Sequence, residues 1–195
     1  MGRWSMIASV SVCGLLLIGC EAQSPAKPAP KELTRESAGH YCQMTVLDHP
    51  GPKGQIFVGD LKQPIWFSSV RDTIAFTRLR EERKDIRAIY VNDMARAETW
   101  ESPGPGTWIG AEDAAYVIGS DARGGMGARE VVPFGDRVAA ERFAAERGGR
   151  IVAWRDVPTD YVLGSDDAGS GAATEAADAA SGHHEPGQGA MEKHQ

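Results

Sequence analysis

The sequence predicts an α+β fold in which two similar units, each with the element order β-β-α-β, form one compact body. Short apolar runs with β-branched residues alternate with a helical pattern, and the series occurs twice between residues 36 and 163. In addition, Phe67 and Phe76 recur 67 residues later as Phe134 and Phe143, at matching positions in strand and helix. An internal duplication explains this spacing, and chance spacing of the phenylalanines is the alternative.

The first unit is assigned to residues 36–101. Its apolar runs predict strands at Gln55–Gly59 and Pro64–Ser68, followed by a helix from about Val70 to Glu82 and a strand at Arg87–Asn92. The helix is expected because apolar residues recur along one face, charged residues occupy the other, and two serines precede it as candidate N-caps.

The second unit is assigned to residues 102–163. It begins with the Pro- and Gly-rich segment Ser102–Trp108, which we predict to be a linker. An aspartate that follows a strand-end phenylalanine is the candidate cap of its helix. The predicted elements are two strands, the helix and a last strand: Ala114–Gly119, Glu130–Phe134, Arg137–Arg147 and Arg150–Trp154.

Residues 1–20 have the features of an export signal rather than of a domain. A positively charged start precedes a short apolar run that ends in Leu-Ile-Gly-Cys, which resembles a bacterial lipobox. We therefore expect Cys20 to become the lipidated first residue of the mature chain, with an ordinary secretory signal as the alternative. Glu21 in the next position favours sorting of the lipoprotein to the outer membrane over retention in the inner membrane.

Two further segments flank the units. Residues 21–35 are rich in proline and alanine, which suits an extended tether. Residues 164–195 are acidic and almost lack large apolar side chains, so we expect them to be disordered. The tip of this tail carries side chains able to collect metal loosely: His183, His184, Met191 and His194.

The charge balance argues against nucleic acid as a partner. The chain has a formal net charge of −6, and removal of the signal takes away Arg3 and no acid, which leaves the mature chain near −7. Basic residues alternate with acidic ones instead of forming a patch.

Cys42 is the one thiol that the mature chain is expected to keep, because Cys13 is removed and Cys20 is acylated. A single thiol in an exported protein is a reactive group, a partner in an intermolecular disulfide or a metal ligand. Met44 follows two positions later, and thiolate with thioether forms a soft donor set that favours Cu(I).

A further ligand must come from elsewhere in the chain. His49 is one candidate, although the Pro-Gly turn after it predicts an exposed ring, and Met126 is another, because it lies among glycines with little to pack against. Met94 follows a strand, and we expect it to be a packing residue rather than a ligand.

Two alternatives to a metal carrier stay open. Cys42 with His40 or His49 would suit a thiol-dependent hydrolase or lyase, but Asp48 is the one evident orienting acid, and no nucleotide loop or Cys-x-x-Cys pair is present. The other alternative is a lipoprotein that docks on a membrane complex without binding metal. We expect the protein not to be an enzyme.

Besides the lipobox, six stretches occur in order along the chain: "YCQMTVLDHPGPKGQIF", "PIWFSSVRDTIAFTRL", "AIYVNDM", "AAYVIGSD", "GMGAREVVPF" and "RFAAERGGRIVAW". Together these motifs resemble the NosL family, the accessory lipoproteins of nitrous-oxide reductase. The resemblance extends over about residues 36–157 and leaves out the tether and the tail.

The resemblance implies a membrane-anchored periplasmic chaperone that binds one Cu(I) ion for the copper centres of nitrous-oxide reductase. It also implies that the chaperone acts together with an ABC-type membrane complex. The fold that it implies consists of two β-β-α-β lobes and is related to that of organomercurial lyase. The family's copper-binding residues fall on Cys42 and Met44, and its Met-Gly motif falls on Met126 and Gly127. His49 stays a candidate for completing the site. Kinship of fold with a lyase does not imply lyase activity.

Overall fold

The computed structural model describes residues 26–164. The predicted signal peptide, Cys20, the first part of the tether and the tail beyond Gly164 lie outside the described residues. Within the described range, no helix is both long enough and apolar enough to cross a membrane.

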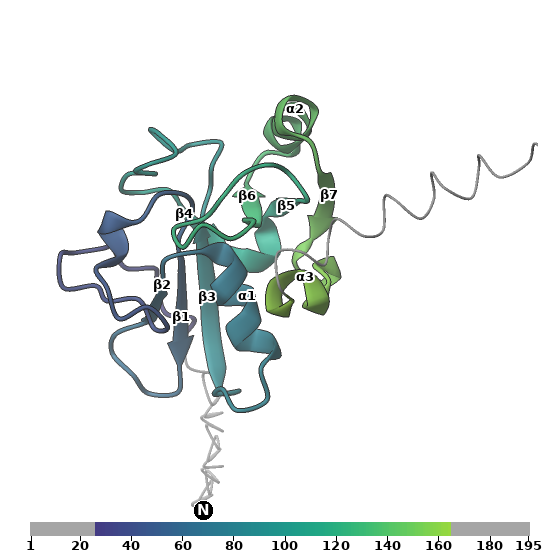
Figure 1. Cartoon of the computed structure of the whole chain (residues 1–195). Coiled ribbons are helices and arrows are strands. Elements are labelled where there is room, and N and C mark those ends of the chain that lie inside the picture. Colours follow the sequence, from purple (N-terminus) through teal and green to yellow (C-terminus); the bar gives the residue numbers. More distant parts are fainter. Residues whose placement is uncertain (1–25, 165–195) are drawn as a thin grey trace, which may run out of the picture.

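The first unit is built on a four-stranded antiparallel sheet (Figure 1). Its strands, in the spatial order β2-β1-β3-β4, are β2 (Ile65–Phe67), β1 (Gly54–Val58), β3 (Ile86–Asn92) and β4 (Trp108–Gly110). Strand β4 comes from the stretch that the sequence assigned to the linker and the second unit, yet it pairs with β3. All five residues of β1 are buried, which explains why its run is continuously apolar around one glutamine.

Helix α1 (Val70–Arg78) follows β2 and packs on β1. The Ser69 side chain caps its N-terminus by accepting a hydrogen bond from the Asp72 backbone N–H. The helix approaches β1 so closely that a Cβ on Gly54 would lie 1.9 Å from the Thr73 hydroxyl oxygen. The prediction of a helix to Glu82 was four residues too long, because Leu79 turns to an extended conformation.

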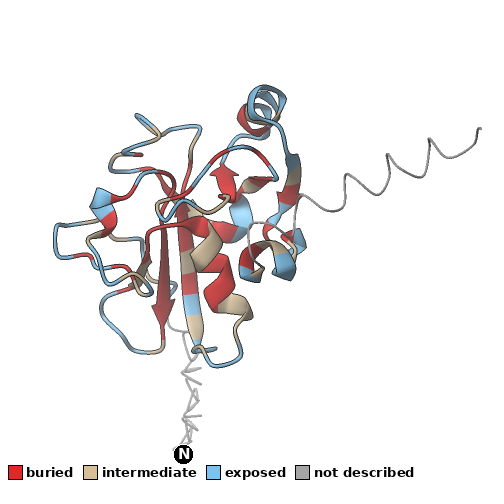
Figure 2. Cartoon of the chain, viewed as in Figure 1, coloured by how far each residue is buried: buried red, intermediate tan, exposed pale blue. Residues whose placement is uncertain are grey.

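The second unit has a three-stranded antiparallel sheet in the order β6-β5-β7. Its elements are β5 (Ala115–Ile118), β6 (Val132–Phe134), α2 (Arg137–Arg147) and β7 (Arg150–Ala153). The Asp136 side chain caps α2 by accepting from the Val138 N–H, as the sequence predicted. Figure 2 shows α2 as largely exposed, and Ala139 and Ala140 are its buried residues.

The two units share one topology, which agrees with an internal duplication. In each, the first strand lies between the second and third, and the helix connects the second to the third. The repeated phenylalanines also make equivalent contacts: the ring centroids are 5.4 Å apart for Phe67 and Phe76, and 5.2 Å apart for Phe134 and Phe143. The α+β class is therefore confirmed, while the relation to organomercurial lyase stays a prediction.

One hydrophobic core joins the units. Val70 and Ile74 of α1 and Val91 of β3 belong to the same buried cluster as Tyr116 and Trp154 of the second unit. Helix α3 (Thr159–Leu163) packs against α1, and three single-turn 3-10 helices complete the fold: Val46–Asp48, Ala111–Asp113 and Trp154–Asp156. The two units thus pack as a single body.

The described part of the tether, residues 26–35, runs along the first sheet without regular secondary structure. The Tyr90 hydroxyl donates to the Pro28 carbonyl at 2.6 Å, and the Gln55 amide exchanges two hydrogen bonds of 2.9 Å with the Lys31 backbone. This stretch docks on the domain through these hydrogen bonds.

Candidate metal site

Cys42 lies in a tight turn ahead of β1. The Gly39 N–H donates to the Met44 carbonyl at 2.9 Å, and the Gln43 N–H donates to the Gly39 carbonyl at 2.8 Å. Gln43 takes a φ of +56°, a value that side-chain-bearing residues seldom adopt. A Cβ on Gly39 would lie 2.5 Å from the Cys42 Sγ, so glycine is needed where the thiol folds back over the turn.

The Cys42 thiol is free, half-buried and surrounded by polar atoms. Its Sγ lies 3.9 Å from the His49 Nε2, 3.8 Å from the Ser68 Oγ and 4.0 Å from the Met44 carbonyl oxygen. Ser68 follows β2 directly and precedes the cap of α1, so the thiol lies beside the N-terminal end of this helix. Helix N-termini favour negative charge, which suits a thiolate ligand.

His49 is buried, with 9% of its surface exposed, and this corrects the expectation of an exposed ring. The reason lies in the second unit, where the Gly125 carbonyl is 3.1 Å from the His49 Nδ1. A carbonyl only accepts, so we assign the proton to Nδ1. The Nε2 lone pair then faces the Cys42 thiol, an arrangement that metal-binding histidines use to fix their tautomer.

The two candidate methionines are both exposed. Met44 has 47% of its surface exposed in the Cys42 turn, and Met126 has 54% exposed at the tip of the loop between β5 and β6. Hydrogen bonds from Gly127 N–H to the Gly124 carbonyl, and from Gly124 N–H to the Ala128 carbonyl, close that loop at 2.9 Å each. Met126 follows Gly125, the residue that contacts His49, so the loop approaches the site from the second unit.

The sequence analysis missed a buried acid beneath this loop. Glu130 is fully buried; its Oε1 accepts from the Arg71 and Val131 N–H groups at 2.9 Å each, and its Oε2 has no hydrogen-bond partner. A Cβ on Gly124 would lie 2.1 Å from that oxygen. Glu130 therefore links the first turn of α1 to the loop that holds His49, and burial raises its pKa to about 8.

Lys53 is a second buried titratable side chain near the site, with 2% of its surface exposed. Its ammonium donates to the Gly51 carbonyl, and burial lowers its pKa to about 8, partly offset by attraction to Glu130. In a sequence, a single acidic or basic residue beside an apolar run usually lies on the protein surface. No signal in the sequence therefore predicted that Lys53 and Glu130 are buried.

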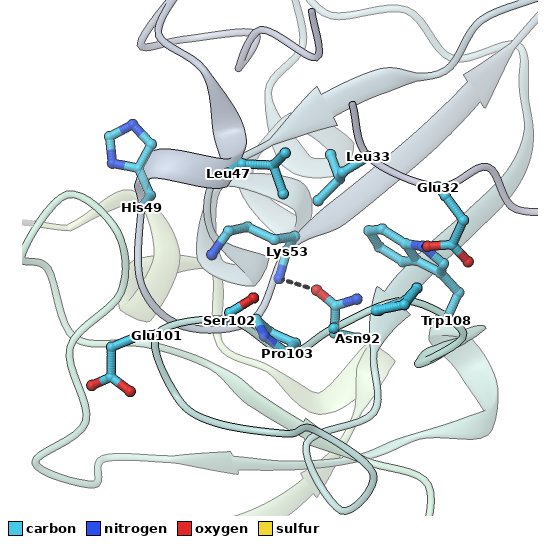
Figure 3. Close-up of a pocket in the computed structure, with 12 residues that line it drawn as sticks. Glu32, Leu33, Leu47, His49, Lys53, Asn92, Glu101, Ser102, Pro103 and Trp108 are labelled. Carbon is cyan, nitrogen blue, oxygen red and sulfur yellow. Dashed lines mark hydrogen bonds between the residues drawn. The ribbon is translucent and has the colours of Figure 1, made fainter. Parts of the chain in front are cut away.

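A cavity of about 280 Å³ adjoins the site (Figure 3). Leu33, Leu47, Pro103 and Trp108 supply apolar walls, and the Lys53 N–H donates to the Asn92 side chain at 2.8 Å on its floor. Figure 3 shows His49 at the edge, with its ring turned away from the other labelled side chains. The cavity therefore adjoins His49, while the His49 ring points away from its other labelled lining residues.

The donor set available at the site is small. In residues 26–164, no group of three or more His, Cys, Asp or Glu side chains is placed to hold a metal ion. Cys42 and His49 form a pair, and Met44 and Met126 are the candidate thioether donors on the turn and the loop beside them. A site with one thiolate, one imidazole and thioethers fits a soft ion of low coordination number.

The geometry does not favour a thiol enzyme. His40 is engaged elsewhere, since its Nε2 lies 3.4 Å from the Glu82 carboxylate and its ring packs on Phe76 with centroids 5.4 Å apart. Asp48 pairs with Arg35 at 3.1 Å, so a backbone carbonyl, not an acid, orients His49. Met94 packs against the core of the second unit, as predicted.

Comparison with known proteins gives one consistent family. The sequence model of the NosL family matches residues 30–162. The chain is 47% identical over 156 residues to the copper-binding lipoprotein NosL of Achromobacter cycloclastes, covering 80% of this chain and 81% of the relative. It is 29% identical over 157 residues to the protein of the same name from Stutzerimonas stutzeri, covering 80% of each.

A solved structure supports the same relation. The crystal structure of the copper chaperone NosL from Shewanella denitrificans superposes with a TM-score of 0.63 at 28% identity. The match covers 68% of this chain and 97% of that one.

Proposed function

The chain belongs to the NosL family, and from this premise we propose that it is a copper chaperone that binds one Cu(I) ion at Cys42 and passes it to an acceptor. The observation that carries the proposal is the pairing of the Cys42 Sγ with the His49 Nε2 at 3.9 Å, in the first unit, where the second unit's Gly125 carbonyl contacts the other ring nitrogen. Both relatives are named copper-binding lipoproteins, and the structural relative is named a copper chaperone.

Cys42 is the anchor ligand in this proposal. Its thiolate is the softest donor at the site, and the N-terminus of α1 favours its negative charge. His49 supplies a neutral nitrogen whose direction is set by the Gly125 carbonyl. Met44 and Met126 supply thioethers, one from each side of the site.

The exposure of both methionines suits transfer. A thioether is a weak ligand, so an acceptor's donor atom can bond to copper while a methionine sulfur leaves. Copper then moves by ligand exchange without being released and without a change of oxidation state. Oxidation to Cu(II) would weaken binding, because thioethers suit the softer ion.

The location and the partners follow from the family resemblance. We place the protein on the periplasmic side of the bacterial envelope, held by lipid on Cys20 and positioned at the outer membrane. The proposed acceptor is nitrous-oxide reductase, together with its ABC-type maturation complex. Docking of residues 26–35 on the first sheet leaves the Cys42 turn uncovered, as transfer requires.

An anaerobic Cu(I) titration of the mature chain against a competing chelator tests this function. We expect one tight equivalent that is lost in Cys42→Ser and weakened about tenfold or more in His49→Ala and Met44→Leu. Met94→Leu is the matched control, because this methionine packs in the core and should leave the affinity unchanged. Equal affinity in Cys42→Ser and the parent chain would refute the proposal.

A further inference from the structure

The cavity beside His49 contains a buried basic side chain that the proposed function does not use. Lys53, the residue before β1, lines this cavity of about 280 Å³ and has 2% of its surface exposed. Figure 3 shows its side chain lying between Leu47 and Ser102, among the residues that line the space. The lysine is therefore held within the cavity wall instead of extending into solvent.

The Lys53 ammonium has no acidic partner. It donates one hydrogen bond, to the Gly51 carbonyl, and among residues 26–164 no carboxylate forms an ion pair with it. Glu130 attracts it from a distance, with no hydrogen bond between the two side chains. Burial therefore has the larger effect and lowers the pKa of Lys53 to about 8. Because an ammonium has further N–H donors, Lys53 can still bind an anion that enters the cavity.

Two other polar side chains of the cavity are already paired. The Asn92 side chain accepts from the Lys53 backbone N–H at 2.8 Å and donates to the Thr107 hydroxyl oxygen at 2.9 Å. The Glu32 carboxylate accepts from the Trp108 indole N–H at 3.2 Å. Neither side chain compensates the charge of the Lys53 ammonium, and an uncompensated buried charge is costly.

The walls and the size of the cavity define the chemistry of a ligand that would pair with Lys53. Leu33, Leu47, Pro103 and Trp108 are apolar, so the part of the ligand away from the ammonium is hydrocarbon. A volume of about 280 Å³ is small for a ligand site, which restricts this part to a few carbon atoms. A carboxylate on a short hydrocarbon chain meets both requirements, and it forms charge-assisted hydrogen bonds with an ammonium.

Two acidic residues limit the charge of the ligand. Glu32 and Glu101 line the same cavity and are exposed. The Lys53 ammonium balances one carboxylate, whereas a second carboxylate on the ligand would face these acids without a cation of its own. The ligand is therefore a monoanion.

We propose that this cavity binds a small organic monocarboxylate, whose carboxylate accepts hydrogen bonds from the Lys53 ammonium and whose hydrocarbon chain packs on Leu47 and Trp108. The site needs neither copper nor Cys42, so the proposal goes beyond the copper chaperone function. His49 also lines the cavity, which places the ligand beside a residue proposed to bind copper.

Isothermal titration calorimetry of the metal-free mature chain tests this site, with pentanoate as the probe in a buffer below the pKa of Lys53. Pentanoate should bind with a stoichiometry of one, whereas pentanamide, which keeps the chain and lacks the charge, should bind at least about tenfold more weakly. Glutarate, a dicarboxylate with the same number of carbons, should also bind at least about tenfold more weakly. Absence of saturable pentanoate binding, or equal affinity for pentanoate and either analogue, would overturn the proposal.

Lys53→Met tests the ammonium itself, because methionine is a long apolar side chain without the charge. The variant should bind pentanoate at least about tenfold more weakly than the parent chain, and urea unfolding checks that it is folded. Lys62→Met is the matched control, since it removes an exposed lysine between β1 and β2 and should leave pentanoate binding unchanged. Equal pentanoate affinity in folded Lys53→Met and the parent chain would overturn the proposal.

Two features of this design separate its outcomes. The comparison of pentanoate with pentanamide uses the parent chain alone, so it decides the proposal even where Lys53→Met does not fold. The titrations contain no copper, so failure of the Cu(I) site at Cys42 would leave their result unchanged.

Discussion

Replacing Glu130 by glutamine should remove much of the pH dependence of stability. In the folded protein burial raises the pKa of Glu130 to about 8, whereas its ordinary value is 4.5. Between these values the folded state binds a proton that the unfolded state has lost, so the stabilising contribution is complete below pH 4.5 and disappears as pH rises to 8. At about 1.4 kcal/mol per pH unit, this window corresponds to a free energy on the order of 5 kcal/mol.

Lys53 acts in the opposite direction above this window. Burial lowers its pKa to about 8 from 10.5, so between these values the unfolded state binds the additional proton and stability rises with pH. The two buried groups together therefore predict a minimum of stability near pH 8. Glutamine at position 130 resembles the protonated acid, since its carbonyl oxygen can accept from the Arg71 and Val131 N–H groups.

The assay is urea unfolding of the parent chain and of Glu130→Gln at several pH values between about 5 and 8. The parent chain should lose several kcal/mol across this range, while the variant changes little and is the more stable protein at the upper end. Glu146→Gln, at an exposed position of α2, should follow the parent chain. Parallel curves for the parent chain and Glu130→Gln would refute the assignment of a buried, protonated acid.

Three further predictions concern the site and the fold. Gly39→Ala places a Cβ 2.5 Å from the Cys42 Sγ, so Cu(I) affinity in chelator competition should fall about tenfold or more; unchanged affinity would contradict the tight turn. Ser69→Ala removes the cap of α1 and should lower the unfolding free energy in urea by about 1 kcal/mol; no loss would mean that the cap contributes nothing. Phe76→Ala empties a fully buried position against Phe67 and should cost about 3–5 kcal/mol in the same assay; a cost below about 1 kcal/mol would contradict the packing.

Local patterns were enough to predict most elements, because strand and helix periodicity depends on neighbours in the chain. Both helices begin at their predicted caps, and the repeated phenylalanines mark equivalent contacts in the two units. The first helix ended early, where Leu79 turns to an extended conformation, and Trp108 entered β4 because it pairs with Asn92 of β3. Intrinsic preference of a short segment does not reveal such pairings.

The sequence by itself was enough to predict the donor chemistry of the candidate site. One cysteine expected to remain after export, two residues before a methionine, predicts a soft-metal site before any fold is known. Only the tertiary structure decided which donors meet. His49 is turned toward Cys42 by a carbonyl 76 residues away, and Glu130 becomes a buried acid because α1 packs over it. Proximity and burial arise from long-range packing, which the local order of residues does not encode.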